Sequence, residues 1–229
     1  MKMLFPLLAT TLLACQSECS ISAVSTANRS DAATLSDASP VDVVTGSDVP
    51  YVPKQLPRHV LIVGDSEAGR VSWVVQDVKN TDDTILVDAK GGTSTTYWGA
   101  SHAARLQQSF TKMPNADTIV IFLGTNDVWR KSLQGCLDDE MEVATQNMLD
   151  SIQKHGISCV WVGPTNVHGQ KWPINDALEN KVSPVCSYFN TEAVKIPLED
   201  GVHPNKDEAR KWLGMVWLMI PPKFEEIAQ

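Results

Sequence analysis

The sequence predicts an α/β fold, in which a parallel β-sheet is covered by helices on both faces. Four apolar runs rich in β-branched residues have the length of buried strands, and they occupy residues 59–63, 84–88, 118–123 and 157–162. Between them lie stretches whose apolar residues recur every three or four positions, which is typical of helices. Strands that alternate with helices in this way favour a parallel sheet.

The remaining elements follow from the same patterns. A fifth strand is expected near residues 193–196, and helices are expected around residues 71–78, 141–152 and 213–220. Asn205, with Glu208 three positions later, has the spacing of an N-terminal cap for the last helix.

The first 14 residues predict an export signal. A charged start is followed by an apolar run that is too short to span a bilayer. The run ends in Leu-Leu-Ala before Cys15, which resembles the cleavage box of bacterial lipoproteins, and this resemblance implies lipidation of Cys15. Because Gln16 rather than an aspartate follows, similarity to Gram-negative lipoproteins favours the outer membrane or cell envelope. The alternative is a plain signal peptide cut nearby, for instance before Cys19, which would leave a periplasmic or secreted protein.

The composition divides the mature chain into two parts. Residues 15–57 are rich in Ser, Thr, Asp and Pro and show no helical or strand period, so they predict a flexible tether. Residues 58–229 are long enough for one domain with a full hydrophobic core.

A serine stands at the end of the first predicted strand. The strand runs into Gly64-Asp65-Ser66, a composition that suits a sharp turn. Ligands of α/β proteins bind outside the carboxyl ends of the strands, so Ser66 is a candidate nucleophile if a base can reach it. The alternative is ordinary turn chemistry.

Three later segments carry groups that would complete an acyl-transfer site. Asp200 and His203 lie three apart before the last helix and could supply the acid and base of a triad. Gly91-Gly92 and Gly124-Thr125-Asn126-Asp127 each follow a predicted strand. A glycine N–H and an asparagine amide could stabilise an oxyanion there.

Together these motifs resemble the SGNH hydrolases, the GDSL-type esterases and lipases. The resemblance covers about residues 59–217 and implies a flavodoxin-like three-layer sandwich with a parallel five-stranded sheet. It implies that Ser66 is the nucleophile, His203 the base and Asp200 its partner. It also implies an oxyanion hole formed by the N–H groups of Ser66 and Gly92 and by the Asn126 amide.

Two features depart from the family pattern. Glu67 follows the serine where the family usually has a small or apolar residue. A carboxylate facing the site would oppose the developing negative charge, so we expect Glu67 to point away or to pair with Arg70. The oxyanion glycine is also open to a one-residue shift, with Gly91 as the alternative to Gly92.

The loops after the strands are expected to select the substrate. They carry Trp98, Trp129, His168 and Trp172, whose rings and polar groups would suit sugar rings and their hydroxyls. The alternative for any single tryptophan is a place in the core. The chain lacks a long apolar lid, which weakens a lipase interpretation.

Cysteines and charge limit the other possibilities. In an exported chain, Cys136 and Cys186 are the candidate disulfide pair, and Cys159 is expected to be a free core thiol. The sequence has no motif for a metal or other cofactor, and none is expected. The net charge of −8 without a basic cluster disfavours nucleic acid and leaves the N-terminal lipid as the only expected membrane contact. The oligomeric state is not predicted.

The sequence therefore predicts a serine esterase that hydrolyses small acyl esters, first among them O-acetyl groups on carbohydrate, through an acyl-enzyme. An O-acyltransferase with the same triad remains an alternative, because only the acceptor differs. A non-catalytic glycan-binding envelope lipoprotein is another, although no triad member is missing. A flavodoxin-like nucleotide binder is disfavoured by the two carboxylates after the first strand.

Overall fold

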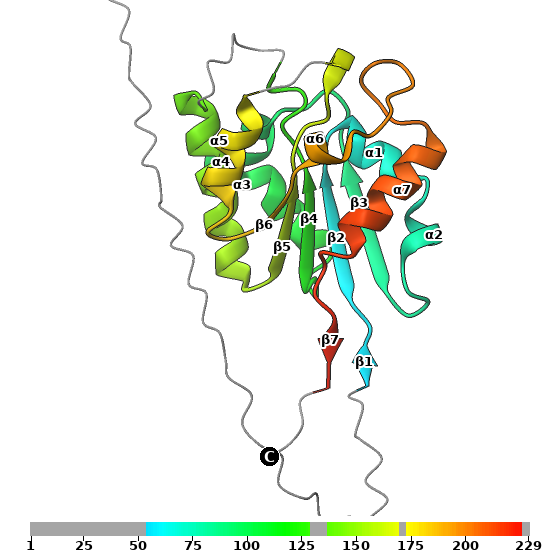
Figure 1. The fold of residues 1–229 in the computed structure, drawn as a ribbon. Helices are drawn as coiled ribbons and strands as arrows, with labels where there is room; N and C mark the ends of the chain where they lie inside the picture. The colour runs from blue at the N-terminus through cyan, green and yellow to red at the C-terminus, as the bar shows by residue number, and fades with distance from the viewer. Residues whose placement is uncertain (1–53, 129–136, 170–172, 226–229) are drawn as a thin grey trace, which may run out of the picture. The chain divides into compact units, whose positions relative to one another are not determined.

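A computed structural model describes residues 54–128, 137–169 and 173–225 of the chain. Its centre is a parallel five-stranded sheet of order β3-β2-β4-β5-β6 (Figure 1). The strands are β2 (His59–Gly64), β3 (Thr84–Ala89), β4 (Thr118–Phe122), β5 (Ser158–Val162) and β6 (Ser187–Phe189). The predicted α/β class and the first four strands are thereby confirmed.

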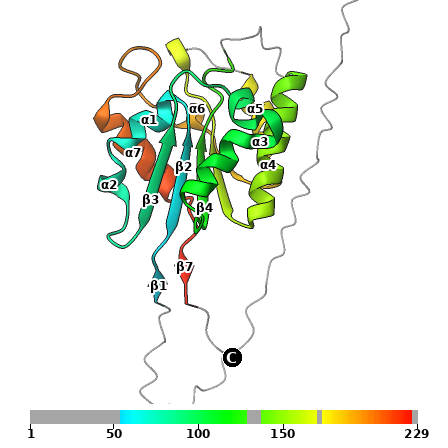
Figure 2. The same ribbon diagram turned by 180° about the vertical axis from the view of Figure 1, so that it is seen from behind.

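Helices cover both faces of the sheet, as predicted. One face carries α1 (Ser66–Ser72), α2 (Val75–Val78) and α7 (Lys206–Trp217), whose apolar residues pack on alternate residues of the strands. The other face carries α3 (Thr95–Lys112), α4 (Asp139–His155) and α5 (Ile174–Val182) (Figure 2). Successive strand residues point to opposite faces, so Val60 and Ile62 enter the first core whereas Leu61 and Val63 enter the second.

The helix ends follow from local chemistry. The Asp138 carboxylate accepts the Met141 N–H at the start of α4, and Gly156 ends this helix in the left-handed conformation, with φ of 64°. Asn205 caps α7 by accepting the Glu208 N–H at 3.0 Å, as the sequence predicts. This cap fixes the chain immediately after His203.

Several boundaries differ from the prediction; the helix expected over residues 71–78, for example, is divided between α1 and α2. The last strand of the sheet, β6, lies earlier than residues 193–196, of which the first two instead end the short helix α6 (Thr191–Val194). The folded part also begins before residue 58, because β1 (Gln55–Leu56) pairs antiparallel with β7 (Lys223–Phe224).

A disulfide joins Cys159 of β5 to Cys186, which directly precedes β6. The prediction of a free Cys159 thiol is wrong, and so is the pairing of Cys186 with Cys136, which lies outside the described residues. Neighbouring strands bring the two cysteines together, since Val160 pairs with Ser187 in the parallel ladder.

Reducing this disulfide should lower the free energy of unfolding by about 2–4 kcal/mol, because the closed loop restricts the unfolded chain. Urea unfolding with and without reductant checks this expectation. Equal stability after mass spectrometry has verified reduction would contradict it.

Candidate active site

Ser66 lies at the carboxyl end of β2 and begins α1. The preceding Gly64 has φ of 152°, and a side chain there would collide with the Phe122 carbonyl of β4. Asp65 then caps the helix by accepting the Glu67 N–H at 2.8 Å. The close strand approach and the cap together fix the turn that presents the serine.

His203 and Asp200 form a hydrogen-bonded chain with this serine. His203 Nε2 lies 2.8 Å from Ser66 Oγ, and His203 Nδ1 lies 2.9 Å from Asp200 Oδ2. Asp200 Oδ1 also accepts the backbone N–H groups of Val202 and His203, at 2.9 and 2.7 Å. These hydrogen bonds, first among them that of the His203 side chain, hold the pKa of Asp200 well below its usual range. An ionised Asp200 is suited to orient a neutral His203 and to stabilise its protonated form.

The loop carrying Asp200 and His203 is held by the segment after β5. Gly201, with φ of 80°, is contacted closely by the His168 ring, which leaves no room for a Cβ atom. The His168 N–H also donates to the Gly201 carbonyl at 2.6 Å. His168 belongs to the turn η1 (Val167–Gly169) and is exposed beside this loop, so its predicted contact with substrate stays a prediction.

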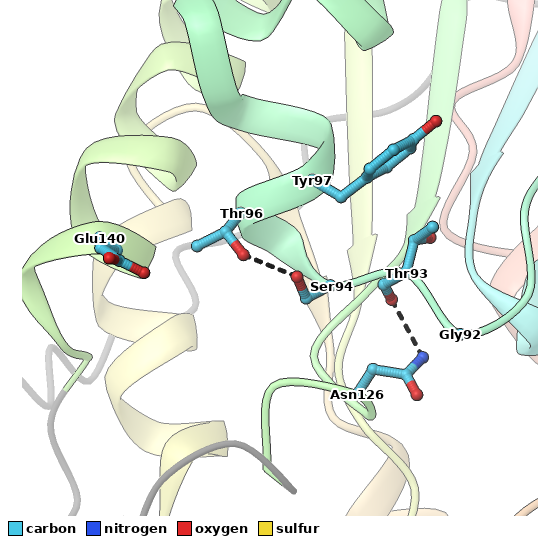
Figure 3. Close-up of a pocket in the computed structure, with 7 residues that line it drawn as sticks. All are labelled: Gly92, Thr93, Ser94, Thr96, Tyr97, Asn126 and Glu140. Atoms are coloured by element: carbon cyan, nitrogen blue, oxygen red, sulfur yellow. Dashed lines mark hydrogen bonds between the residues drawn. The ribbon is translucent and has the colours of Figure 1, made fainter.

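Both candidate oxyanion segments lie near Ser66. A Cβ atom at Gly91 would lie 3.8 Å from the Ser66 Cβ, whereas Gly92 takes φ of 72° and shares a pocket with Asn126. Asn126 Nδ2 donates to Asp65 Oδ2 at 2.9 Å and to the Thr93 carbonyl at 3.0 Å, the second bond being visible in Figure 3. The shared pocket favours Gly92 over Gly91 as the oxyanion donor, and this role stays a prediction.

The pocket has a volume of about 620 Å³, and its lining mixes polar and apolar surface. Figure 3 shows its seven residues, which are Gly92, Thr93, Ser94, Thr96, Tyr97, Asn126 and Glu140. Thr93, Ser94 and Thr96 thus border the same space as Gly92 and Asn126, two of the predicted oxyanion residues. Glu140 escaped the sequence analysis because nothing in its neighbourhood on α4 distinguishes it from an exposed helix residue.

Trp98 does not contribute to this pocket, contrary to the prediction. Its side chain is fully buried in the core beside α4, and its indole N–H donates to Thr93 Oγ1 at 2.9 Å. It can therefore support the pocket wall but cannot stack on a substrate. The other two predicted aromatic contacts, Trp129 and Trp172, lie outside the described residues, as does the lipidation candidate Cys15.

Glu67 points into the protein rather than pairing with Arg70. Its side chain is 1% exposed, and its Oε1 atom lies 2.8 Å from Thr165 Oγ1, within hydrogen-bond distance. Arg70 Nη2 instead lies 3.9 Å from Asp200 Oδ2. Of the two expected alternatives, pointing away from the site therefore fits Glu67, and pairing with Arg70 does not. The sequence showed an unusual residue here, but not its burial.

Burial changes the acidity of both carboxyls that flank Ser66. Desolvation is the largest effect and raises the pKa of Asp65 to about 7. Desolvation and the neighbouring Asp65 raise the pKa of Glu67 well above its usual range. The site thus contains a pair of acids that retain protons more readily than surface carboxyls.

The free energy of unfolding should carry a contribution from Asp65 that falls between about pH 4 and pH 7. An unfolded aspartate ionises near pH 4, whereas folded Asp65 retains its proton up to about pH 7, so over this range the unfolded state binds fewer protons. Asp65→Asn should remove this contribution and give a flatter dependence of Tm on pH than the unchanged chain. Parallel Tm curves for the two proteins would contradict the assignment.

The described residues show no group of three His, Cys, Asp or Glu side chains that could hold a metal ion. Within the same ranges, none of the helices has the length and apolar character needed to cross a bilayer.

Comparisons of sequence with family models and with curated proteins give no match. Comparison of structure gives several. TesA is 20% identical, with a TM-score of 0.52, over 70% of this chain and 97% of its own. A candidate SGNH hydrolase from Slackia heliotrinireducens is 11% identical, with a TM-score of 0.50, over 71% of this chain and 100% of its own. The YXIM protein of Bacillus subtilis is 12% identical, with a TM-score of 0.51, over 72% of this chain and 56% of its own. The described domain therefore has the fold of the SGNH hydrolases.

Proposed function

We propose that this chain is a serine esterase of the SGNH type that hydrolyses small acyl esters. The observation that carries the proposal is the continuous hydrogen-bonded chain from Ser66 Oγ through His203 to Asp200, with heavy-atom distances of 2.8 and 2.9 Å. A serine bonded to a base that is itself oriented by a carboxylate is the arrangement that activates a hydroxyl for acyl transfer.

The proposed reaction follows from these contacts. Ser66 Oγ attacks the ester carbonyl and its proton passes to His203 Nε2, which leaves a tetrahedral intermediate with a negative oxygen. That intermediate collapses to an acyl-enzyme while His203 returns the proton to the departing alcohol. A water molecule activated by His203 then attacks the acyl-enzyme, which releases the acid and restores Ser66.

The oxyanion is assigned to the N–H groups of Ser66 and Gly92 and to the Asn126 amide. Both amide hydrogens of Asn126 are donated in this structure, to Asp65 and to Thr93. The cycle therefore requires one of them to be shared with the oxyanion or to turn toward it.

The substrate class is proposed to be O-acetyl esters of carbohydrate. The pocket beside Asn126 is lined by Ser94, Thr96 and Glu140, whose hydroxyl and carboxyl groups can exchange hydrogen bonds with sugar hydroxyls. Tyr97, at 37% exposure, presents an aromatic ring at the same pocket, where a sugar ring could stack.

The place of action is proposed from the N-terminal sequence alone. The export signal of residues 1–14 and the lipoprotein-type box before Cys15 support a lipid-anchored protein of a bacterial cell envelope, with residues 15–57 as its tether. Palmitate labelling of the expressed chain, and its loss in Cys15→Ser, would test this assignment.

The activity is tested with the full-length chain on p-nitrophenyl esters from acetate to octanoate and on an acetylated polysaccharide. We expect turnover of the acetate to exceed that of the octanoate and acetate to be released from the polysaccharide. A folded chain that turns over none of these substrates would overturn the proposal. Preference for octanoate would preserve the esterase and overturn the proposed substrate class.

A further inference from the structure

The carboxyl group of Glu67 lies buried immediately after the nucleophile, where the reaction described above assigns it no task. Its side chain is 1% exposed, and in the described part of the chain it forms no ion pair with a lysine or arginine. The groups that face it come from three segments, namely Asp65 before α1, Thr125 after β4 and Thr165 after β5. Asp65 is the only titratable group among these three, and the next carboxylate, Asp127, faces Asp65. Such surroundings favour the neutral acid.

Thr165 connects this carboxyl to the loop that carries His203. Its hydroxyl oxygen lies 2.8 Å from Glu67 Oε1 and 3.5 Å from the Val202 carbonyl oxygen. A threonine hydroxyl has one hydrogen and can accept others. If Glu67 were ionised, that single hydrogen would be committed to the carboxylate. If Glu67 is neutral, its own O–H can donate to Thr165, and the threonine hydrogen becomes available to Val202.

Val202 lies at the centre of the loop that sets the triad geometry. Its N–H donates to Asp200 Oδ1, and the next residue is His203 itself. The segment after β5 contacts this loop at a second point, where His168 packs against Gly201. The Val202 carbonyl is therefore a place at which a small shift would move both Asp200 and His203 relative to Ser66.

We propose that Glu67 is a positioning residue. As a neutral acid it donates a hydrogen bond to Thr165, whose own hydroxyl hydrogen then bonds the Val202 carbonyl and holds the Asp200–His203 loop in place beside Ser66. The inference rests on the proposed esterase function, because its consequence is read in the rate of that reaction. The two ends of this chain of contacts adjoin two triad members in the sequence: Glu67 follows Ser66, and Val202 precedes His203. Glu67, the residue that follows Ser66, would thus stabilise the position of His203.

The test compares Glu67→Gln with Glu67→Leu in the full-length chain, with p-nitrophenyl acetate as substrate. Glutamine can donate from its amide to Thr165 as the neutral acid does, whereas leucine fills similar space without a donor. We expect Glu67→Gln to keep kcat within about 3-fold and Glu67→Leu to lower kcat by about 10- to 100-fold, with KM changed little in both, because misplacing a reacting group costs rate rather than binding. Thr165→Ser should retain the rate and Thr165→Val should lose it to the same degree as Glu67→Leu.

The pH profile separates positioning from a general loss of stability. Activity of the unchanged chain should fall at high pH as Glu67 ionises. Glu67→Gln should lack this fall, because its amide does not titrate. Tm values measured alongside show whether each variant is folded, and the Thr165 pair decides the matter if Glu67→Leu does not fold.

The outcomes distinguish this inference from the esterase proposal beneath it. If the unchanged chain has no activity that depends on Ser66, the esterase proposal fails. If that activity exists, the positioning role is overturned by equal impairment of Glu67→Gln and Glu67→Leu, by full activity of folded Thr165→Val, or by a Glu67→Gln profile with the same fall at high pH.

Discussion

Ser66→Ala should lower kcat/KM for p-nitrophenyl acetate by about 10³- to 10⁶-fold. The change removes the oxygen that lies 2.8 Å from His203 Nε2, while leaving the turn fixed by Gly64 and the Asp65 cap. Stopped assays of initial rate against ester concentration measure the effect.

A matched control for this change is Ser183→Ala, which replaces an exposed serine at the end of α5. It should retain the full rate, and both variants should keep the Tm of the unchanged chain within a few degrees. Activity of Ser66→Ala equal to that of Ser183→Ala would remove the basis for assigning Ser66 as the nucleophile.

His203→Gln should produce a loss of similar size, about 10³- to 10⁶-fold in kcat/KM, because glutamine can occupy the space but cannot take the serine proton. The carboxylate partner adds a second expectation. Hydrogen bonds from His203 and from the backbone keep the pKa of Asp200 below its usual range, so Asp200 stays ionised throughout the assay range. A fall in activity at acid pH should therefore not arise from protonation of Asp200.

His155→Gln is the control for this variant. His155 ends α4, stacks on Phe110 with ring centroids 3.9 Å apart and contacts the Ser151 carbonyl, so it makes none of the triad contacts. We expect its kcat/KM to match that of the unchanged chain. A His203→Gln protein that remains folded and active would show that another base serves Ser66.

The parts of the fold that the sequence predicts are those set by local patterns. β2 and β4 are unbroken apolar runs, buried on both faces by helices, and such runs are visible without knowledge of their partners. The Asn205 cap is likewise a short-range feature, and it occurs where expected. The order of the motifs also predicted that Ser66, Asp200 and His203 lie together, although 137 positions separate the serine from the histidine.

The sequence predictions are wrong where contacts between residues far apart in the chain determine the structure. β6 has three residues and depends on pairing with β5 and on the Cys186 disulfide, whereas Ala193 and Val194 follow the Asn190 cap and belong to α6. The burial of Glu67 could not be predicted either, because its partner Thr165 lies 98 positions away in the sequence. Trp98 follows the oxyanion segment in sequence, yet the helix it enters turns its ring toward the core.

Trapping the covalent intermediate tests the central claim most directly. The full-length chain is mixed with p-nitrophenyl acetate, quenched in acid within the first turnovers and digested for peptide mapping by mass spectrometry, with a fluorophosphonate as a second, stable label. We predict acetyl and phosphonyl groups on Ser66, no label at that peptide in Ser66→Ala, and much slower labelling in His203→Gln. Label on a different residue, or ester turnover in which Ser66 is never modified, would contradict a serine esterase built on this triad.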